Sequence, residues 1–160
     1  MKKLLALVCA LMFTLMVVAG CISSAAKKDG GGTSSQAKPA AGTKVETSVK
    51  QDGHYTDKDH VAAYIHEFKK LPSNYITKAE ATKLGWKEKG TLDKVAPGKS
   101  IGGDHFGNFE KQVPDKQGRS WKECDIDYVK GNRGAKRIVF SNDGLIYYSD
   151  SHYKDFVKMY

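Results

Sequence analysis

The feature that most restricts the fold of this chain is a change of period at Pro97. Before it, apolar residues between Val61 and Leu71 recur at helical spacing; after it, apolar and polar residues alternate as in half-buried strands. The link at residues 142–144, Asn-Asp-Gly between two alternating runs, is a tight-turn signal typical of a hairpin. Helices followed by hairpin-linked strands predict an α+β fold, with N-terminal helices packed on one face of a C-terminal antiparallel sheet. The other face is then open for binding.

The second helix has a clear start signal. Thr77-Lys78-Ala79-Glu80 is a capping box, and Leu84-Gly85 is a suitable end. Lys78 falls in the first turn, where the helix dipole disfavours a cation by about 0.3 to 1 kcal/mol. It is either an ordinary solvated lysine or a functional one, and position alone favours neither. Two helices are expected, at 61–71 and 77–84, and the first has Thr56 or Asp57 as its cap. A helical turn is expected at 91–96, and strands are expected at 99–105, 120–126, 135–141, 144–149 and near 156.

Strand alternation assigns side chains to the two faces of the sheet. Trp121, Glu123 and Asp125 point one way, with Arg137 and Val139 on the neighbouring strand, whereas Lys122, Cys124, Ile126, Ile138 and Phe140 point the other way. If the second set forms the core, Glu123, Asp125 and Arg137 share the open face, which is too polar to be a second core. The pattern alone fits a solvated surface with routine ion pairs equally well.

The N-terminus has the layout of a lipoprotein signal. Lys2 and Lys3 precede an apolar run at 4–18, and small residues stand directly before Cys21, so we expect cleavage before Cys21 and a lipid on its thiol. A retained transmembrane helix is the alternative, but about 15 apolar residues fall short of the roughly 20 that span a bilayer. We assign residues 1–21 to the signal, including the lipidated cysteine. Residues 22–51, rich in Ser, Ala, Lys, Gly and Thr, form a disordered tether, and 52–160 form one domain.

Charge and cysteine content narrow the possible functions. Removing residues 1–21 takes away two lysines and no acidic residue, so the formal charge falls from +8 to +6. A basic protein favours polyanions such as RNA and anionic membrane surfaces. Cys9 leaves with the signal and Cys21 carries lipid, so Cys124 has no intramolecular partner and is expected to be a small buried residue. The five histidines lack zinc-like spacing, so no metal site is expected.

Several blocks carry a resemblance to a known family. The segments at 71–78 (LPSNYITK) and 96–104 (APGKSIGGD), the run Trp121-Lys122-Glu123-Cys124-Asp125 and the pair His152-Tyr153 resemble the barnase-like secreted bacterial guanyl-preferring ribonucleases. The resemblance covers almost all of residues 52–160. In that family a glutamate deprotonates the 2′-hydroxyl of RNA, the oxygen attacks the adjacent phosphorus, and a histidine protonates the departing 5′-oxygen.

The resemblance implies a role for each matching residue. Glu123 matches the general base, His152 the general acid and Arg137 the arginine on the phosphate. Lys78 and Arg133 match the remaining cations, and Asp125 matches an aspartate that holds Arg137 in place. The product is a 2′,3′-cyclic phosphate, and no metal or cofactor takes part. The RNA site is expected on the open face of the sheet.

A guanine-recognition loop is implied at residues 106–110. The family's loop places backbone amides opposite the purine carbonyl oxygen, and a glutamate matching Glu110 accepts hydrogen bonds from guanine. This chain departs from the commonest pattern, with Gly107 in place of serine and Phe109 in place of arginine, so base preference is less secure than RNA cleavage. Phe109 could still stack on a base. The residues expected to bind RNA are Arg133, Phe106, Asn108, Phe109, Glu110 and Tyr153.

These expectations describe an extracellular endoribonuclease that is a monomer, tethered to the outer face of the cell membrane through Cys21 and cleaving single-stranded RNA after guanosine. The resemblance also implies a barstar-like cytoplasmic inhibitor with an acidic surface. The alternative is a non-catalytic RNA- or polyanion-binding lipoprotein of the same fold. A glycosidase with Glu123 and Asp125 as its carboxyl pair is disfavoured, because flanking arginines oppose the protonated acid that such a pair needs.

Overall fold

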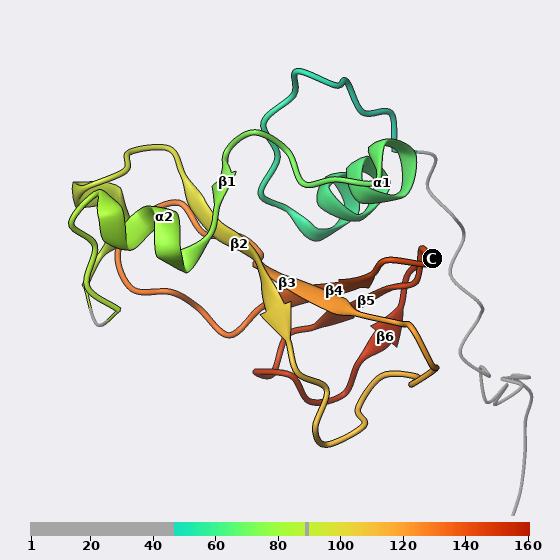
Figure 1. Ribbon diagram of the computed structural model, residues 1–160. Helices are drawn as coiled ribbons and strands as arrows, with labels where there is room; N and C mark the ends of the chain where they lie inside the picture. Colours follow the sequence, from blue (N-terminus) through green and yellow to red (C-terminus); the bar gives the residue numbers. More distant parts are fainter. Residues whose placement is uncertain (1–46, 89) are drawn as a thin grey trace, which may run out of the picture. The chain divides into compact units, whose positions relative to one another are not determined.

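The computed structural model describes residues 47–88 and 90–160, which contain a six-stranded sheet with the order β1-β2-β3-β4-β5-β6 (Figure 1). The predicted signal, Cys21 and tether residues 22–46 lie outside the described residues. Within the described part of the chain, no helix is long and apolar enough to cross a membrane. The elements are α1 (Lys58–Phe68), β1 (Tyr75–Ile76), α2 (Lys78–Lys83), the 3₁₀ turn η1 (Leu92–Lys94), β2 (Ser100–Phe106), β3 (Trp121–Asp125), β4 (Arg137–Ser141), β5 (Ile146–Ser149) and β6 (Val157–Lys158).

The sheet confirms the α+β class but is mixed rather than antiparallel. β1 runs parallel to β2, and every later neighbour pair is antiparallel. The expectation of a purely antiparallel sheet is wrong at this edge because a strand of two residues is too short to show alternation. The β4–β5 hairpin is confirmed, with Phe140 opposite Ile146 and with Gly144 at φ 96°, a value that favours glycine.

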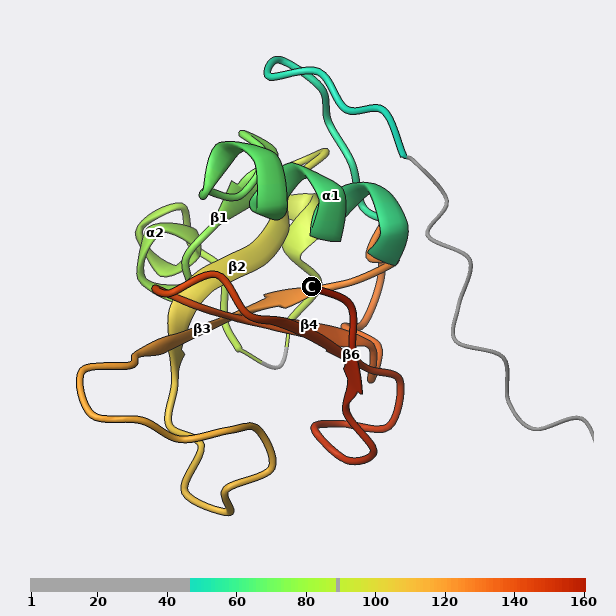
Figure 2. The same cartoon turned by 90° about the vertical axis from the view of Figure 1, so that its right-hand side faces the viewer.

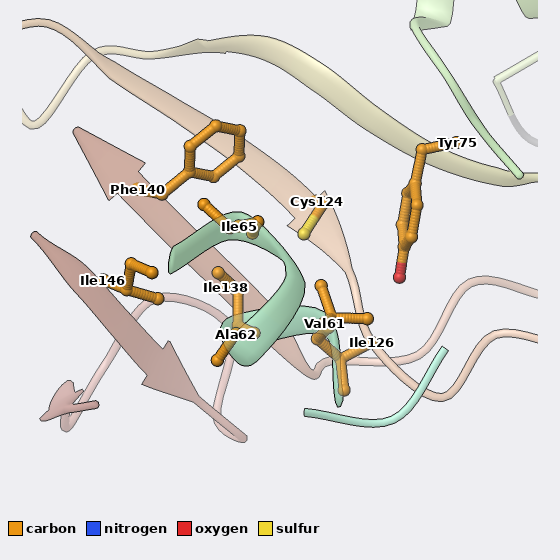
Figure 3. Packing of buried hydrophobic residues seen from close by; sticks show 9 residues of the cluster. All are labelled: Val61, Ala62, Ile65, Tyr75, Cys124, Ile126, Ile138, Phe140 and Ile146. Carbon is orange, nitrogen blue, oxygen red and sulfur yellow. The ribbon is translucent and has the colours of Figure 1, made fainter. Parts of the chain in front are cut away.

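The main core lies between α1 and one face of the sheet. The side chain of Asp57 accepts from the backbone N–H of His60 and begins the helix. The core residues of α1 face side chains from β3, β4 and β5 and from the loop after β3 (Figure 3). Cys124 is buried there, as predicted, and burial raises the pKa of its thiol. The labelled members of this cluster are Val61, Ala62, Ile65, Tyr75, Cys124, Ile126, Ile138, Phe140 and Ile146.

The second helix packs elsewhere, although its predicted capping box is confirmed. α2 contributes to a separate cluster through Ala81, which packs with Trp86 and with Ile101 of β2. A Cβ atom at Gly102 would meet Cys124 and Tyr75 in the main core, so the preceding Ile101 points to the opposite face. The expectation that both helices cover one face therefore holds for α1 and is wrong for α2.

The face away from α1 is only partly open. Trp121 of β3 and Val139 of β4 form a third buried cluster with Val113, and partly buried residues of the loops after β2 and β5 pack against it. Both loops hang on this side of the sheet (Figure 2). The expectation that the face is too polar for a second core is wrong at the Trp121 end, because loops cover it. Glu123, Asp125 and Arg137 occupy the other part of this face.

The contacts of the domain begin before its predicted boundary at residue 52. The backbone N–H of Lys50 donates to the Tyr55 hydroxyl at 3.0 Å, and the Tyr64 hydroxyl donates to the carbonyl oxygen of Gln51 at 2.7 Å. Lys50 and Gln51 were assigned to the tether on composition, which does not reveal hydrogen bonds made by the backbone.

Candidate active site

Three charged side chains of β3 and β4 are buried on the face away from α1. Glu123 is 6% exposed, Asp125 2% and Arg137 4%. Asp125 stands opposite Arg137 in the antiparallel register, so the two side chains lie next to each other on one face. Buried charges are tolerated when they are paired and hydrogen-bonded, and each of these three has such partners.

Asp125 holds two arginines. Nε and one terminal nitrogen of Arg133 donate to its two carboxylate oxygens at 2.6 and 2.7 Å, and this pairing raises the pKa of Arg133. Nε of Arg137 lies 3.1 Å from Oδ1 of the same carboxylate. Another nitrogen of Arg137 donates to the carbonyl oxygens of Gly134 and Lys136 at 2.8 and 2.7 Å. Asp125 therefore positions Arg133 as well as the expected Arg137.

Glu123 lies between a lysine and a tyrosine. Nζ of Lys78 donates to its Oε1 at 3.0 Å. Burial, followed by a hydrogen bond to Glu123, raises the pKa of Tyr153 to about 12. The Tyr153 hydroxyl also accepts from Nε of Arg137 at 3.2 Å, which connects the carboxylate to the arginines. The structure thus places Lys78, Glu123, Asp125, Arg137 and Tyr153 in one continuous network.

Asp104 fixes the position of Lys78, a role that the sequence analysis missed. Its carboxylate accepts from the backbone N–H of Lys78 at 2.9 Å, at the start of α2. The register of β2 against β3 shifts between Gly102 and Asp104, with Gly103 at φ 98°, so a bulge turns Asp104 toward the helix. The pair Gly102-Gly103 inside an alternating run is a signal for such a bulge.

Asp93 is a second residue that the sequence analysis missed. Its carboxylate accepts from the backbone N–H of Gly131 at 2.9 Å and from the Tyr128 hydroxyl at 3.1 Å. The bond from Gly131 is the main reason why the pKa of Asp93 is lowered. These bonds attach the loop that carries Arg133 to η1. No local pattern points to them, because 38 positions separate Asp93 from Gly131.

His152 lies in the loop after β5. Its backbone N–H donates to the carbonyl oxygen of Ala135 at 3.3 Å, which ties this loop to the loop that carries Arg133 and leads into Arg137 of β4. His152 and Tyr153 both have left-handed backbone conformations, with φ 53° and 66°, which are uncommon for residues other than glycine. The exposed His152 lines a hollow of about 350 Å³ together with Arg133 and Arg137. His152, Arg133 and Arg137 therefore border the same space.

The predicted recognition loop borders a second hollow, of about 330 Å³, which also includes His152, Tyr153 and Lys154. The side-chain amide of Asn108 bonds within the loop. It donates to the carbonyl oxygen of Val113 at 2.9 Å and accepts from the backbone N–H of Val113 at 3.1 Å. Its amide thus shapes the loop. Glu110 and Phe109 are exposed.

Phe106 packs against two rings of the segment after β5, those of Tyr153 and Phe156. Its ring stacks on that of Tyr153, with centroids 5.4 Å apart, and packs edge-on against Phe156 at 6.1 Å. The guanidinium of Arg137 also lies over the Tyr153 ring, 5.7 Å from its centroid. Phe106 therefore belongs to the third cluster and helps to fix Tyr153.

The arrangement combines proton-transfer groups with fixed positive charge. A carboxylate and an imidazole can serve as base and acid, and two arginines and a lysine can stabilise a phosphate that gains negative charge. Within the described residues, no group of three or more His, Cys, Asp or Glu side chains could hold a metal ion. The elements that fix this site are β3, β4, the start of α2 and three loops.

Comparisons with known proteins agree with this chemistry. Residues 58–160 match the family model described as ribonuclease. A ribonuclease of Heyndrickxia coagulans is 53% identical over 102 residues, which are 63% of this chain and 94% of that protein. Ribonucleases of Bacillus intermedius and Bacillus pumilus are also 53% identical over 102 residues, and the match spans 63% of the length of each. The chain belongs to the barnase-like family of bacterial ribonucleases.

Proposed function

We propose that this protein is an endoribonuclease that cleaves single-stranded RNA by transphosphorylation, without a metal ion. The observation that carries the proposal is the buried Glu123, bound by Lys78 and connected through Tyr153 to the arginines that share a hollow with His152. Membership of the ribonuclease family supports the reaction class.

The reaction is an internal displacement at phosphorus. The Glu123 carboxylate takes the proton of the 2′-hydroxyl, and the 2′-oxygen forms a bond to the adjacent phosphorus. The bond from phosphorus to the 5′-oxygen of the next nucleotide breaks, and His152 donates a proton to that oxygen. The products are a 2′,3′-cyclic phosphate and a free 5′-hydroxyl, so protons and electron pairs balance. A well-placed acid or base of this kind contributes about 10²- to 10⁴-fold.

The cations act on the transition state. The phosphorane carries more negative charge than the phosphodiester, so fixed positive groups lower the barrier more than they tighten binding of the substrate. Arg133 and Arg137 are already held by Asp125 and by backbone carbonyl groups. They need little reorganisation during the reaction. Lys78 is 38% exposed, which leaves its ammonium accessible to a phosphate oxygen as well as to Glu123.

Guanosine preference follows from Glu110. Its carboxylate can accept from the ring N–H and the exocyclic amine of guanine, a donor pair that adenine lacks on the corresponding edge. Asn108 supports this role indirectly, because its two bonds to Val113 hold the loop in shape around the hollow. Backbone amides of residues 106–110 then face the purine carbonyl oxygen.

The location and partners of the enzyme follow from its N-terminal sequence and charge. Removal of residues 1–20 and lipidation of Cys21 would hold a monomeric domain at the outer face of the cell membrane, with the tether as a spacer. A basic mature chain suits RNA and also a barstar-like cytoplasmic inhibitor with an acidic surface. Purifying the tagged mature chain from producing cells at low salt tests the inhibitor, and recovery of no acidic partner would count against it.

Analysis of the reaction products tests the activity. The mature chain without its lipidated Cys21, residues 22–160, is incubated with RNA in the presence of EDTA, and the ends of the fragments are identified. We expect 2′,3′-cyclic phosphates, and a loss of about 10²-fold or more in rate for Glu123→Ala and for His152→Ala. Glu67→Ala and His105→Ala change exposed residues of the same types outside the site and serve as controls. Binding that weakens with salt but gives no cleavage would instead support the polyanion-binding alternative.

A further inference from the structure

Glu88 is an acidic side chain at the rim of a hollow that otherwise has only neutral and basic residues. It lines the hollow of about 350 Å³ together with Arg133, Arg137 and His152, and the two further lining residues carry no charge. A hollow that receives a phosphate gains affinity from its cations and loses affinity through a carboxylate. The proposed reaction assigns no role to Glu88, so its charge in this place needs another explanation.

The turn that carries Glu88 is held in place by hydrogen bonds. The indole N–H of the buried Trp86 donates to the carbonyl oxygen of Gly90 at 2.9 Å, and the backbone N–H of Gly90 donates to the carbonyl oxygen of Lys87. Trp86 in turn packs with Leu92 of η1. The place of Glu88 beside the hollow is therefore fixed by a buried ring and not by chance contact at the surface.

The Glu88 carboxylate is free to act on a ligand. Glu88 is exposed, and across residues 47–88 and 90–160 its carboxylate forms no ion pair. Glu123 and Asp125, the buried carboxylates of the site, are each bound by cations. Their charge is largely neutralised by these partners, whereas the charge of Glu88 acts on any anion that enters the hollow.

The charge of a phosphate depends on the number of its ester bonds. A phosphodiester within RNA carries one negative charge, whereas a terminal phosphate monoester carries nearly two at neutral pH, because its second pKa is about 6. A carboxylate nearby therefore opposes the monoester about twice as strongly as the diester. A cyclic phosphate still carries one charge, but its hydrolysis, in which water adds and the bond from phosphorus to the 2′-oxygen breaks, gives a 3′-monoester.

We propose that Glu88 is a selectivity residue, which lowers the affinity of the site for terminal phosphate monoesters relative to phosphodiesters by charge repulsion. This inference rests on the proposed function and refines the choice of ligand at the same site. Internal linkages of RNA are bound, whereas ends that carry a 3′-phosphate are released. The phosphorane also gains negative charge, so the same repulsion opposes the transition state. Glu88 thus favours release of the product and slows the chemical step slightly.

Two ligands that differ by one methyl ester, and hence in charge, test the selectivity. They are 2′-deoxyguanosine 3′-phosphate and its methyl diester, neither of which can form a cyclic phosphate, and their affinities for the mature chain are measured at low salt. We expect Glu88→Gln to tighten binding of the monoester by about 2- to 5-fold more than binding of the diester. Glu67→Gln, at an exposed glutamate of α1, is the control.

Three results of this measurement would overturn the proposal. They are equal changes for both ligands in Glu88→Gln, no change for either ligand, and failure of the wild-type chain to bind these ligands or their deoxyadenosine counterparts. The last result would show that the hollow does not receive a phosphate.

Two further substitutions show whether charge, and not shape, gives the effect. Glu88→Asp keeps the charge and should keep most of the discrimination. Asn132→Asp adds a second carboxylate to the same hollow and should weaken binding of the monoester by a similar factor. Added salt should reduce all these differences, because it screens exposed charges. Differences that salt leaves unchanged, or an Asn132→Asp protein that binds the monoester as tightly as the wild type, would overturn the proposal.

Inhibition by the product gives a readout that a merely structural role would not move. In Glu88→Gln the 3′-monoester should inhibit cleavage of RNA more strongly, whereas the single-turnover rate should stay the same or rise. A fall in the single-turnover rate would show that Glu88 takes part in the chemistry and would overturn the proposal. The binding measurements need no turnover. If the wild-type chain does not cleave RNA but Glu88 still discriminates between the two ligands, the proposed function fails and the selectivity stands.

Discussion

Asp125 and Glu110 are both carboxylates at the candidate site, but the structure treats them differently. Asp125 is 2% exposed and binds two arginines on the floor of the site, whereas Glu110 is exposed on a loop beside Gln112. We use "floor" for Lys78, Glu123, Asp125, Arg133 and Arg137. Lys78, Glu123, Asp125 and Arg137 of the floor lie on α2, β3 and β4, and Arg133 lies on the loop after β3. The buried centre of the floor, Asp125, cannot change without disturbing the fold. The loop, residues 106–113, can vary while the floor stays intact, which fits its unusual Gly107 and Phe109.

The largest expected effect is that of Asp125→Asn. Removing one partner of a buried ionic network leaves two guanidinium groups without their counter-charge, at a cost of about 3 to 5 kcal/mol in the free energy of unfolding. The rate on RNA should also fall, because neither arginine is then held. Denaturant unfolding and single-turnover cleavage measure the two effects. A stable Asp125→Asn protein with normal activity would show that the floor tolerates change as the loop does.

Lys78→Met comes next and separates rate from stability. The loss of one preorganised charge from the transition state should lower the rate by about 10²- to 10³-fold. Stability should change little, because Lys78 is partly exposed. Lys83→Met, at the end of the same helix, is the matched control. If both substitutions reduced the rate equally, general charge and not position would explain the role of Lys78.

Glu110→Gln should affect selection more than chemistry. A hydrogen bond to a charged acceptor contributes about 1.5 to 3 kcal/mol, so the preference for guanosine over adenosine should fall by about 10- to 100-fold. Cleavage of GpA and ApA dinucleotides, compared through kcat/KM, measures it. Cleavage of ApA should be retained. A drop of the same size for both dinucleotides would assign Glu110 to the floor and end the distinction between the two regions.

Asp143→Asn is the smallest expected change and the control for Asp125→Asn. Asp143 and Arg119 form an ion pair at 2.7 Å that joins the β4–β5 turn to the segment before β3, away from the site. Hydrogen bonds from Arg119 hold the pKa of Asp143 well below its ordinary value. Its contribution to stability is therefore present above that ordinary value, near pH 4, and is lost as the pH falls further. Melting temperatures between pH 2 and 7 should show a flatter acid dependence for Asp143→Asn, with normal activity at pH 7.

The sequence predicted the floor better than it predicted the loops, for a local reason. Alternation along β3 and β4 depends on strand geometry alone, so it correctly assigned Glu123 and Arg137 to the face opposite Cys124. The placing of Arg133 and His152 depends on long-range bonds, such as that from Gly131 to Asp93, which no periodicity encodes. These two residues were found through family resemblance.

The errors in the predicted fold have the same origin. β1 was missed because Tyr75 and Ile76 become a strand only by pairing with β2. The third cluster was missed because its members come partly from loops, including Val113 and Phe156, which show no period. A pattern within one segment reveals which way its side chains point, but not which other segment covers them.

The single cysteine of residues 47–160 offers a built-in reporter. Cys124 is 1% exposed between α1 and the sheet, where a thiol reagent cannot reach it while the helix stays in place. The rate at which such a reagent labels the native protein therefore measures how often α1 lifts from the sheet. Because no dye has to be attached beforehand, this opening of α1 can be followed in the unmodified domain, with and without RNA.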